Sequence, residues 1–214
     1  MDINQKHVSL DLMEFIEKQI LPRYTEFDKG HNLRHVTRVI NNSMQLAKVT
    51  GANYDMAYVI AAYHDLGLKG PRAIHHITSG KILAADARLK KWFNAEQIKI
   101  MKEAVEDHRA SSSRQPRSIY GKIVAEADRD LDVHEIFLRC ILYGLDNYPH
   151  LDTEGQWKRF ERHMQEKYSS DGYLRLWIPA SPNEKKLKEI RSILADRALL
   201  RQHFDTIYND IIKK

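Results

Sequence analysis

Four residues that can bind a metal ion lie on predicted helices far apart in the sequence: His35, the adjacent pair His64 and Asp65, and Asp128. Each sits on or beside the apolar face of its helix, so each is expected to point towards the protein interior. Burying a histidine or an aspartate without a partner is costly. Because three helices each turn such a residue inward, a shared divalent cation is the simplest partner.

The pair His64–Asp65 carries the strongest signal. It follows the apolar run Ala57–Tyr63 and stands two positions before Gly67. At the end of a buried helix, the two side chains can approach one ion from different directions. An imidazole together with a carboxylate suits Mn, Fe, Co, Ni or Zn better than Mg or Ca, which prefer oxygen ligands. We therefore expect one divalent ion of this group at the pair, with Asp65 bridging to a second ion or orienting a water.

The other two members of the set each have an alternative interpretation. A lone histidine on an apolar face, such as His35, can be a core histidine with its hydrogen bonds satisfied. Asp128 lies four positions after Val124 and three before Leu131, which places it on the apolar face, where it can also pair with an arginine. His31 would share a helix face with His35, but near a helix start it can instead cap the helix or line the site entrance.

The pattern resembles the HD-domain superfamily of all-helical, metal-dependent phosphohydrolases. The resemblance covers roughly residues 25–135, whereas residues 145–214 match no general feature of that family. It implies an all-α fold, a divalent metal held by the four residues above, and hydrolysis of a phosphoester. The matching positions are His35 with Arg38 and Val39, the doublet His64–Asp65, and Ala127–Asp128.

Some HD subfamilies hold two metal ions and insert two further histidines between the doublet and the last aspartate. His76 and His108 are the candidates for these positions, with Asp65 between the two ions. His76 stands shortly before a glycine at the start of a helix, and His108 shares the apolar face of the helix that it ends. His75 competes with His76, and the spacing from Asp65 to His76 is shorter than expected for such subfamilies. Either histidine can also be a simple core residue.

The chemistry that follows is attack on phosphorus by a metal-activated water. A bound cation with an open position lowers the pKa of its water to roughly 7 to 9. Phosphoryl transfer also needs cations around the non-reacting oxygens. We predict Asp65, Lys69 and Arg38 as the catalytic set. Other basic residues near the predicted ligands are Arg34, Arg72, Lys81, Lys122 and Arg129.

The predicted function is a metal-dependent phosphohydrolase whose partner is a small phosphorylated substrate, a nucleotide in the first instance. Two alternatives stay open: a di-iron oxygenase on the same scaffold and ligand positions, and a non-catalytic HD module that binds a nucleotide. Residues 67–70 read Gly-Leu-Lys-Gly, so the Glu-Asp pair that follows the doublet in alarmone hydrolases is missing. The Gly-Tyr-Pro motif of cyclic-dinucleotide HD enzymes is missing too.

Composition bounds the partners and the compartment. The chain has 214 residues, with 34 basic and 29 acidic residues dispersed along it and a net charge of +5. Dedicated nucleic-acid binding usually shows a concentrated basic stripe, so it is not expected here. The single cysteine, Cys140, cannot form an internal disulfide, which favours the cytoplasm. The longest apolar run, Met56–Tyr63, is too short to span a membrane. A homo-oligomer is compatible with the sequence.

Helical periodicity recurs along the whole chain. It predicts a compact all-α single-domain bundle with a C-terminal extension: residues 1–144 form the core and residues 145–214 the extension, whose aromatic residues are expected to pack it onto the first helices. The helix 55–66 is apolar almost all round and should be central, with Gly67 as its cap. The other predicted helices cover about 8–20, 36–47, 82–93, 95–108, 117–143, 153–168 and 187–211, the last as one helix or two.

Overall fold

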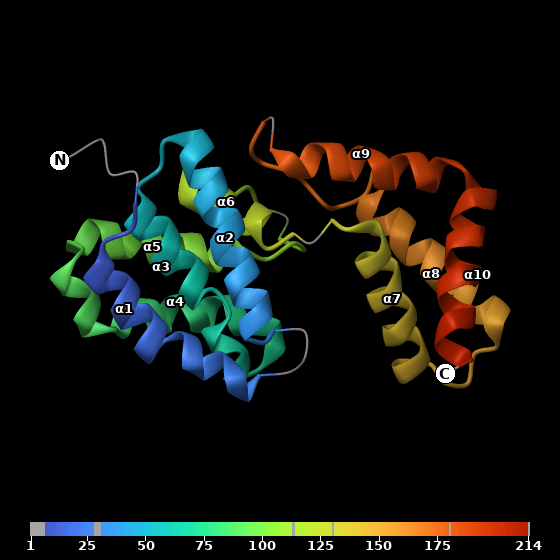
Figure 1. Ribbon diagram of the computed structural model, residues 1–214, viewed down its shortest axis with the longest axis horizontal. Helices are drawn as coiled ribbons and strands as arrows, with labels where there is room; N and C mark the ends of the chain where they lie inside the picture. Colours follow the sequence, from blue (N-terminus) through green and yellow to red (C-terminus); the bar gives the residue numbers. More distant parts are fainter. Residues whose placement is uncertain (1–6, 28–30, 113, 130, 180, 214) are drawn as a thin grey trace. The chain divides into compact units, whose positions relative to one another are not determined.

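The computed structural model describes residues 7–27, 31–112, 114–129, 131–179 and 181–213, and the regular elements in these ranges are all helical (Figure 1). The all-α prediction is confirmed. The chain divides into two compact units, Met1–Asp128 and Arg129–Lys214. Among the described residues, no helix combines the length and the apolar character that crossing a membrane requires.

The first unit surrounds one buried helix, α3 (Tyr54–Tyr63), whose residues 55–63 are all buried. Helices on several sides pack against it, as expected for a helix that is apolar all round. The elements around it are α1 (Leu10–Gln19), η1 (Leu21–Glu26), α2 (Leu33–Thr50), η2 (Leu66–Lys69), η3 (Arg72–Ile74), α4 (His75–Ala85), η4 (Ala87–Lys91), α5 (Ala95–Asp107) and α6 (Ile119–Ala127).

Local signals fix the helices that carry the predicted ligands. Asn32 caps α2, with its side chain accepting a hydrogen bond from the backbone N–H of His35. Gly51 ends that helix with φ +68°, a left-handed conformation that favours glycine. Asn94 and Gln97 form a reciprocal capping box at the start of α5. The ends of these two helices were therefore readable from the sequence.

Three predicted helices differ from the structure. The central helix ends at Tyr63 rather than at residue 66, and Gly67 belongs to the following 3₁₀ turn instead of capping α3. The predicted helix 117–143 is two helices, because the Asp132 side chain accepts from the backbone N–H of Glu135 and starts α7 (Val133–Asn147) afresh. The predicted helix 82–93 begins earlier, as α4, and Asp86 then caps the separate turn η4.

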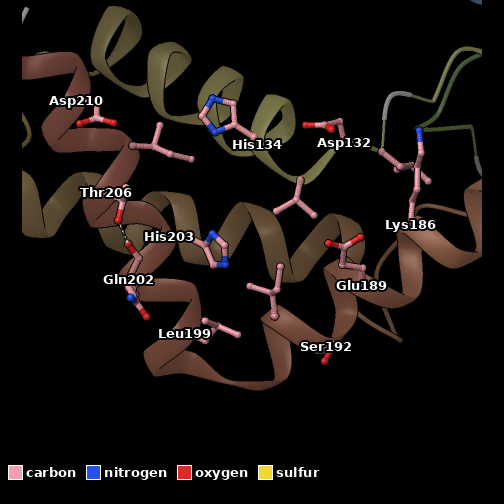
Figure 2. Close-up of a pocket in the computed structure, with 14 residues that line it drawn as sticks. Asp132, His134, Lys186, Glu189, Ser192, Leu199, Gln202, His203, Thr206 and Asp210 are labelled. Atoms are coloured by element: carbon pink, nitrogen blue, oxygen red, sulfur yellow. Dashed lines mark hydrogen bonds between the residues drawn. The ribbon is translucent and has the colours of Figure 1, made fainter.

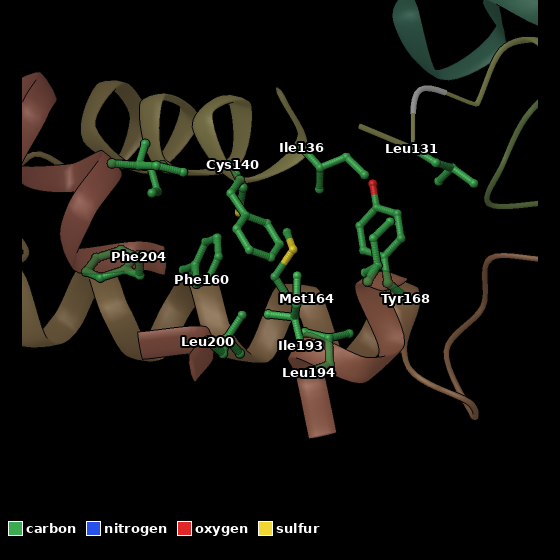
Figure 3. Packing of buried hydrophobic residues seen from close by; sticks show 14 of the residues in the cluster. Leu131, Ile136, Cys140, Phe160, Met164, Tyr168, Ile193, Leu194, Leu200 and Phe204 are labelled. Carbon is green, nitrogen blue, oxygen red and sulfur yellow. The ribbon is translucent and has the colours of Figure 1, made fainter. Parts of the chain in front are cut away.

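In the described residues of the second unit, four helices enclose an apolar core of their own. Helix α7 packs against α8 (Thr153–Tyr168), α9 (Pro182–Ala195) and α10 (Arg197–Ile212). The Phe160 and Phe204 rings meet in this core at a tilt of 46°, 5.2 Å apart between centroids, and Cys140 and Met164 belong to the same cluster (Figure 3). Helices α9 and α10 are separate, because the Asp196 side chain caps α10.

Two expectations about this part of the chain can now be compared with the structure. The predicted division placed α7 with residues 1–144, whereas α7 packs with α8, α9 and α10. The aromatic residues Trp157, Phe160 and Tyr168 were expected to pack the extension onto the first helices. They are buried in the core of the second unit itself.

Candidate metal centre

The four residues predicted to share one ion meet at one point of the first unit. His35 comes from the first turns of α2, His64 and Asp65 follow the end of α3, and Asp128 ends α6. The Nε2 atoms of His35 and His64 are 3.1 Å apart. The Asp65 Oδ2 lies 3.3 Å from the first of these nitrogens and 3.1 Å from the second. The Asp128 Oδ1 is 3.4 Å from His35 Nε2 and 3.9 Å from His64 Nε2.

These separations fit donors that surround a single divalent ion. Donor atoms about 2.1 Å from one ion lie roughly 3.0–3.4 Å apart at tetrahedral or octahedral angles. Two imidazole nitrogens and two carboxylate oxygens converge at close to these distances from three helices. His64 is fully buried, and Asp65 is only 3% exposed. The residues present therefore fit a metal ion of the nitrogen- and oxygen-binding kind.

A second group of donors adjoins the first and shares Asp65. The other oxygen of this carboxylate, Oδ1, lies 3.5 Å from His75 Nε2 and 3.5 Å from His108 Nε2. The two imidazole nitrogens are themselves 3.1 Å apart. These atoms are close enough to hold a second ion. The Asp65 carboxylate thus presents one oxygen to each group, the arrangement expected of a bridging ligand.

His76, the histidine predicted for this second group, lies outside both donor groups, and its neighbour His75 occupies the place. The His76 ring is 6.5 Å from the His108 ring, centroid to centroid, and its Nδ1 is buried without a hydrogen-bond partner. Both histidines stand at the first turn of α4, so helical periodicity does not separate them. The separation depends on the turn η3, which lets the Arg72 carbonyl accept from the His75 ring.

Three of the four histidine rings in the two donor groups are oriented by the same local contact. The Nδ1 of His64 lies 2.7 Å from the Ala61 carbonyl, three residues earlier. The same relation holds for His75 and for His108, whose Nδ1 is 2.6 Å from the Val105 carbonyl. Because a carbonyl only accepts, Nδ1 carries a proton in each ring, which leaves Nε2 as the nitrogen that can bind an ion. Ligating histidines in metal sites are commonly fixed in this way.

The electrostatics of the cluster favour a cation. Burial disfavours the charged form of His64, but the carboxylates of Asp65 and Asp128 outweigh burial and raise its pKa to about 9. Burial opposes ionisation of Asp65 too, yet the surrounding imidazoles hold its pKa well below the usual range. Burial and the neighbouring His108 lower the pKa of His75 to about 4. The two carboxylates that raise the pKa of His64 are the same groups that would attract a divalent cation.

Residues that sequence reasoning missed hold the doublet in place. Tyr24, on η1, donates its hydroxyl proton to the Ala62 carbonyl at 3.0 Å and accepts from the Asp65 N–H at 3.3 Å. The buried Ser79 hydroxyl accepts from the Gly67 N–H at 2.8 Å. A Cβ on Gly67 would lie 2.2 Å from the His75 carbonyl oxygen. Only the last of these had a signal in the sequence, the glycine itself.

The two basic residues predicted to be catalytic have different surroundings. The Arg38 Nη2 lies 3.2 Å from His35 Nδ1, directly behind a proposed ligand. The Lys69 ammonium pairs with Glu26 at 2.5 Å and is half exposed. His31 was expected to share a helix face with His35, or else to cap the helix or line the site entrance. It lies 3.4 Å from the Arg72 guanidinium and belongs to neither donor group.

A pocket of about 500 Å³ adjoins the doublet, lined by Glu26, Phe27, Leu68, Lys69 and Arg72. It connects to the metal centre through backbone contacts. The Leu68 N–H donates to the Asp65 carbonyl, and the Arg72 carbonyl accepts from the ring of a second-group histidine. The pocket therefore combines an aromatic ring and two cationic side chains beside the donor groups.

A larger pocket, of about 760 Å³, lies in the second unit between α7, α9 and α10 (Figure 2). Its lining includes the two histidines His134 and His203 and the apolar side chains of Ile193 and Ile207. It is lined by none of the predicted metal ligands or catalytic residues. Pocket size therefore does not mark the place where these side chains converge.

Comparisons with known proteins bear on the family and the fold. The family model for the HD domain matches residues 32–131, a range that holds all the donors described above. The Bacillus subtilis protein YpgQ, solved in complex with ADP, has 17% identity and a TM-score of 0.59, and the match covers 94% of this chain and 95% of that one. This likeness shows a shared fold.

A second solved structure is a predicted HD superfamily hydrolase from an uncultured Thermotogales bacterium. Its identity is 19% and its TM-score 0.45, and the match covers 71% of this chain and 82% of that one. A search of curated proteins found no significant match.

Proposed function

We propose that this chain, whose residues 32–131 match the family model for the HD domain, is a metal-dependent phosphohydrolase acting on a nucleotide or another small phosphoester. The observation that carries the proposal is the pair of donor groups that share the Asp65 carboxylate. We assign His35, His64, Asp65 and Asp128 to the first ion, and Asp65, His75 and His108 to the second. His75 thereby replaces His76 in the predicted ligand set.

The bound ions would supply an activated water and a Lewis acid for the phosphoryl group. The residues of the chain then have three tasks. The Nε2 atoms of His35, His64, His75 and His108 would hold the ions, and a carbonyl fixes the Nδ1 proton in the last three of these rings. The Asp65 carboxylate would offer one oxygen to each donor group. Arg38, beside His35, and the cations of the adjoining pocket, Lys69 and Arg72, neutralise the non-reacting phosphate oxygens.

A nucleotide is the substrate class that the adjoining pocket supports. Phe27 offers an aromatic ring to a base, while Lys69 and Arg72 offer positive charge to phosphates. The volume of about 500 Å³ lies within the range of small-molecule sites. YpgQ, which shares the fold, was solved with ADP. These observations favour a nucleoside phosphate over a bare aryl phosphate.

The test begins with protein purified without chelators, its metal content measured, and then loaded with Mn, Co or Ni. Nucleoside mono-, di- and triphosphates and an aryl phosphate are offered, and both phosphate and pyrophosphate are quantified. We expect release from a nucleotide that depends on added metal. Asp65→Asn should abolish it, whereas Asp146→Asn, at an exposed position of α7, should not. No release by any metal form from any of these substrates would refute the hydrolase.

Two other functions remain as outcomes of the same experiment. Donor groups that share a carboxylate also suit a pair of irons, so a di-iron oxygenase would show a redox-active mixed-valence signal in the purified protein. A nucleotide that binds the metal-loaded protein but stays intact would indicate a non-catalytic binding module. Both readouts are independent of phosphate release.

A further inference from the structure

Tyr24 contacts the backbone at the His64–Asp65 doublet from a different part of the chain. Its side chain is fully buried, and it reaches from η1 to the end of α3, a helix that begins thirty residues later. The hydroxyl makes two hydrogen bonds there, as a donor to the Ala62 carbonyl at 3.0 Å and as an acceptor from the Asp65 N–H at 3.3 Å. Both partners lie in residues 62–65, where α3 ends and the proposed metal ligands His64 and Asp65 follow.

The end of a helix leaves its last carbonyl groups without intrahelical partners. In α3 these carbonyls are used by side chains. The Ala61 carbonyl accepts from the His64 ring, which orients that ligand, and the Ala62 carbonyl accepts from Tyr24. The chain then leaves the helix, and Asp65 takes φ −111° and ψ 5°. A buried turn of this kind needs its polar groups satisfied to keep one conformation.

Asp65 is held through its backbone on both sides. Its N–H donates to Tyr24, and its carbonyl accepts from the Leu68 N–H at 3.0 Å. Its carboxylate, by contrast, is surrounded by the imidazole nitrogens of the two donor groups. A bound ion would take over those side-chain contacts. The direction of the carboxylate towards both donor groups therefore depends on these two hydrogen bonds of the Asp65 backbone.

We propose that Tyr24 is a positioning residue for the metal centre: its hydroxyl fixes the turn from Ala62 to Asp65 so that the carboxylate faces both donor groups. The proposal rests on the proposed metal site. It concerns the affinity for the ions rather than the reaction.

The chain offers a matched control one residue before the doublet. Tyr63 is also fully buried, and its hydroxyl donates to the Asp86 Oδ2 at 2.8 Å, away from both donor groups. Tyr63→Phe thus removes one buried hydroxyl and one long-range hydrogen bond from the same end of α3. It leaves the Ala62 and Asp65 backbone contacts in place.

The experiment compares wild type, Tyr24→Phe and Tyr63→Phe by Mn²⁺ titration and by the visible absorption of the Co²⁺ forms. Loss of a group that supports a metal ligand costs 10- to 100-fold in metal affinity. We expect Tyr24→Phe to bind Mn²⁺ about tenfold more weakly and to change the Co²⁺ spectrum, with Tyr63→Phe within about twofold of wild type. Equal affinities of Tyr24→Phe and wild type, or equal losses in the two variants, would overturn the proposal.

A second measurement keeps the proposal testable if Tyr24→Phe does not fold. 3-Fluorotyrosine is placed at position 24 or at position 63, and the fluorine resonance is followed during metal titration. The resonance at position 24 should shift with metal occupancy, and the resonance at position 63 should not. The reverse result would contradict the positioning role of Tyr24. If wild type binds metal but hydrolyses nothing, the proposed function fails while this proposal stands. If Tyr24→Phe retains metal affinity and wild-type hydrolysis, this proposal fails alone.

Discussion

His75→Ala should lose the second ion and His76→Ala should keep it, although the two residues are neighbours. His75 supplies one of the three donor atoms of the second group, and its Nε2 lies 3.5 Å from the shared carboxylate and 3.1 Å from His108 Nε2. His76 supplies none of the described donors. Its nearest counterpart in the group is the ring of His108, 6.5 Å away between centroids.

The size of the effect can be worked from these contacts. Groups that only support a ligand change metal affinity by 10- to 100-fold, so removal of a ligand should weaken the second position by at least about 100-fold, or about 3 kcal/mol. At a metal concentration about ten times the wild-type dissociation constant, occupancy of that position then falls from roughly nine-tenths to one-tenth. Total metal per chain should fall from nearly two to about one.

The assay is metal content per chain after equilibrium dialysis, with calorimetric titration of each variant. His76→Ala serves as the control and should keep both ions, because the first donor group and His75 remain. The reasoning is refuted if His76→Ala loses the second ion while His75→Ala retains it. It is equally refuted if wild type never exceeds one ion per chain at saturating metal.

Three further outcomes follow, one from a close backbone approach and two from the raised pKa of His64. Gly67→Ala should destabilise the first unit by roughly 1–3 kcal/mol in urea unfolding, because its Cβ would meet backbone atoms. Gly70→Ala is the control and should be close to neutral, because the nearest atom to its Cβ would lie 3.6 Å away. Equal unfolding midpoints of the two variants would contradict the close approach at Gly67. Metal binding at His64 must displace the proton held by its raised pKa of about 9, so affinity should rise about tenfold per pH unit from 7 towards 9 and then level off. Calorimetry in buffers of different ionisation enthalpy should show proton release at pH 7, and none would argue against the charged ring. In the metal-free protein the same ring contributes stability that is complete below about pH 6.5 and lost as the pH rises through 9.

The first donor group was predictable because its signal is local. His35, His64 and Asp128 each lie at a helix position whose apolar neighbours fix the inward direction, and the structure brings them together. The split of the predicted helix 117–143 was not visible, because α6 and α7 both bury an apolar face and the periodicity runs on across the break. The Asp132 cap that separates them is one aspartate among several in that stretch.

The choice between His75 and His76 and the early end of α3 have a different cause. Both are decided by polar backbone contacts, one remote in sequence and one local. The central helix stops at Tyr63, where the Tyr24 hydroxyl donates to the Ala62 carbonyl, and the turn η3 places the Arg72 carbonyl against the His75 ring. A pattern of apolar residues contains no information about such contacts. It therefore extended the helix to residue 66 and left the two histidines equivalent.

The orientation of the histidines separates one ligand from the rest. His64, His75 and His108 each hold the Nδ1 proton on a carbonyl of their own helix turn, which directs Nε2 to the ions without help from other elements. His35 instead has its Nδ1 facing Arg38, which can only donate. A neutral His35 ring that accepts from Arg38 carries its proton on Nε2, the atom that faces the other donors. Ion binding at this nitrogen and the Arg38 contact are therefore opposed, and the ion that takes Nε2 weakens the hold on the guanidinium.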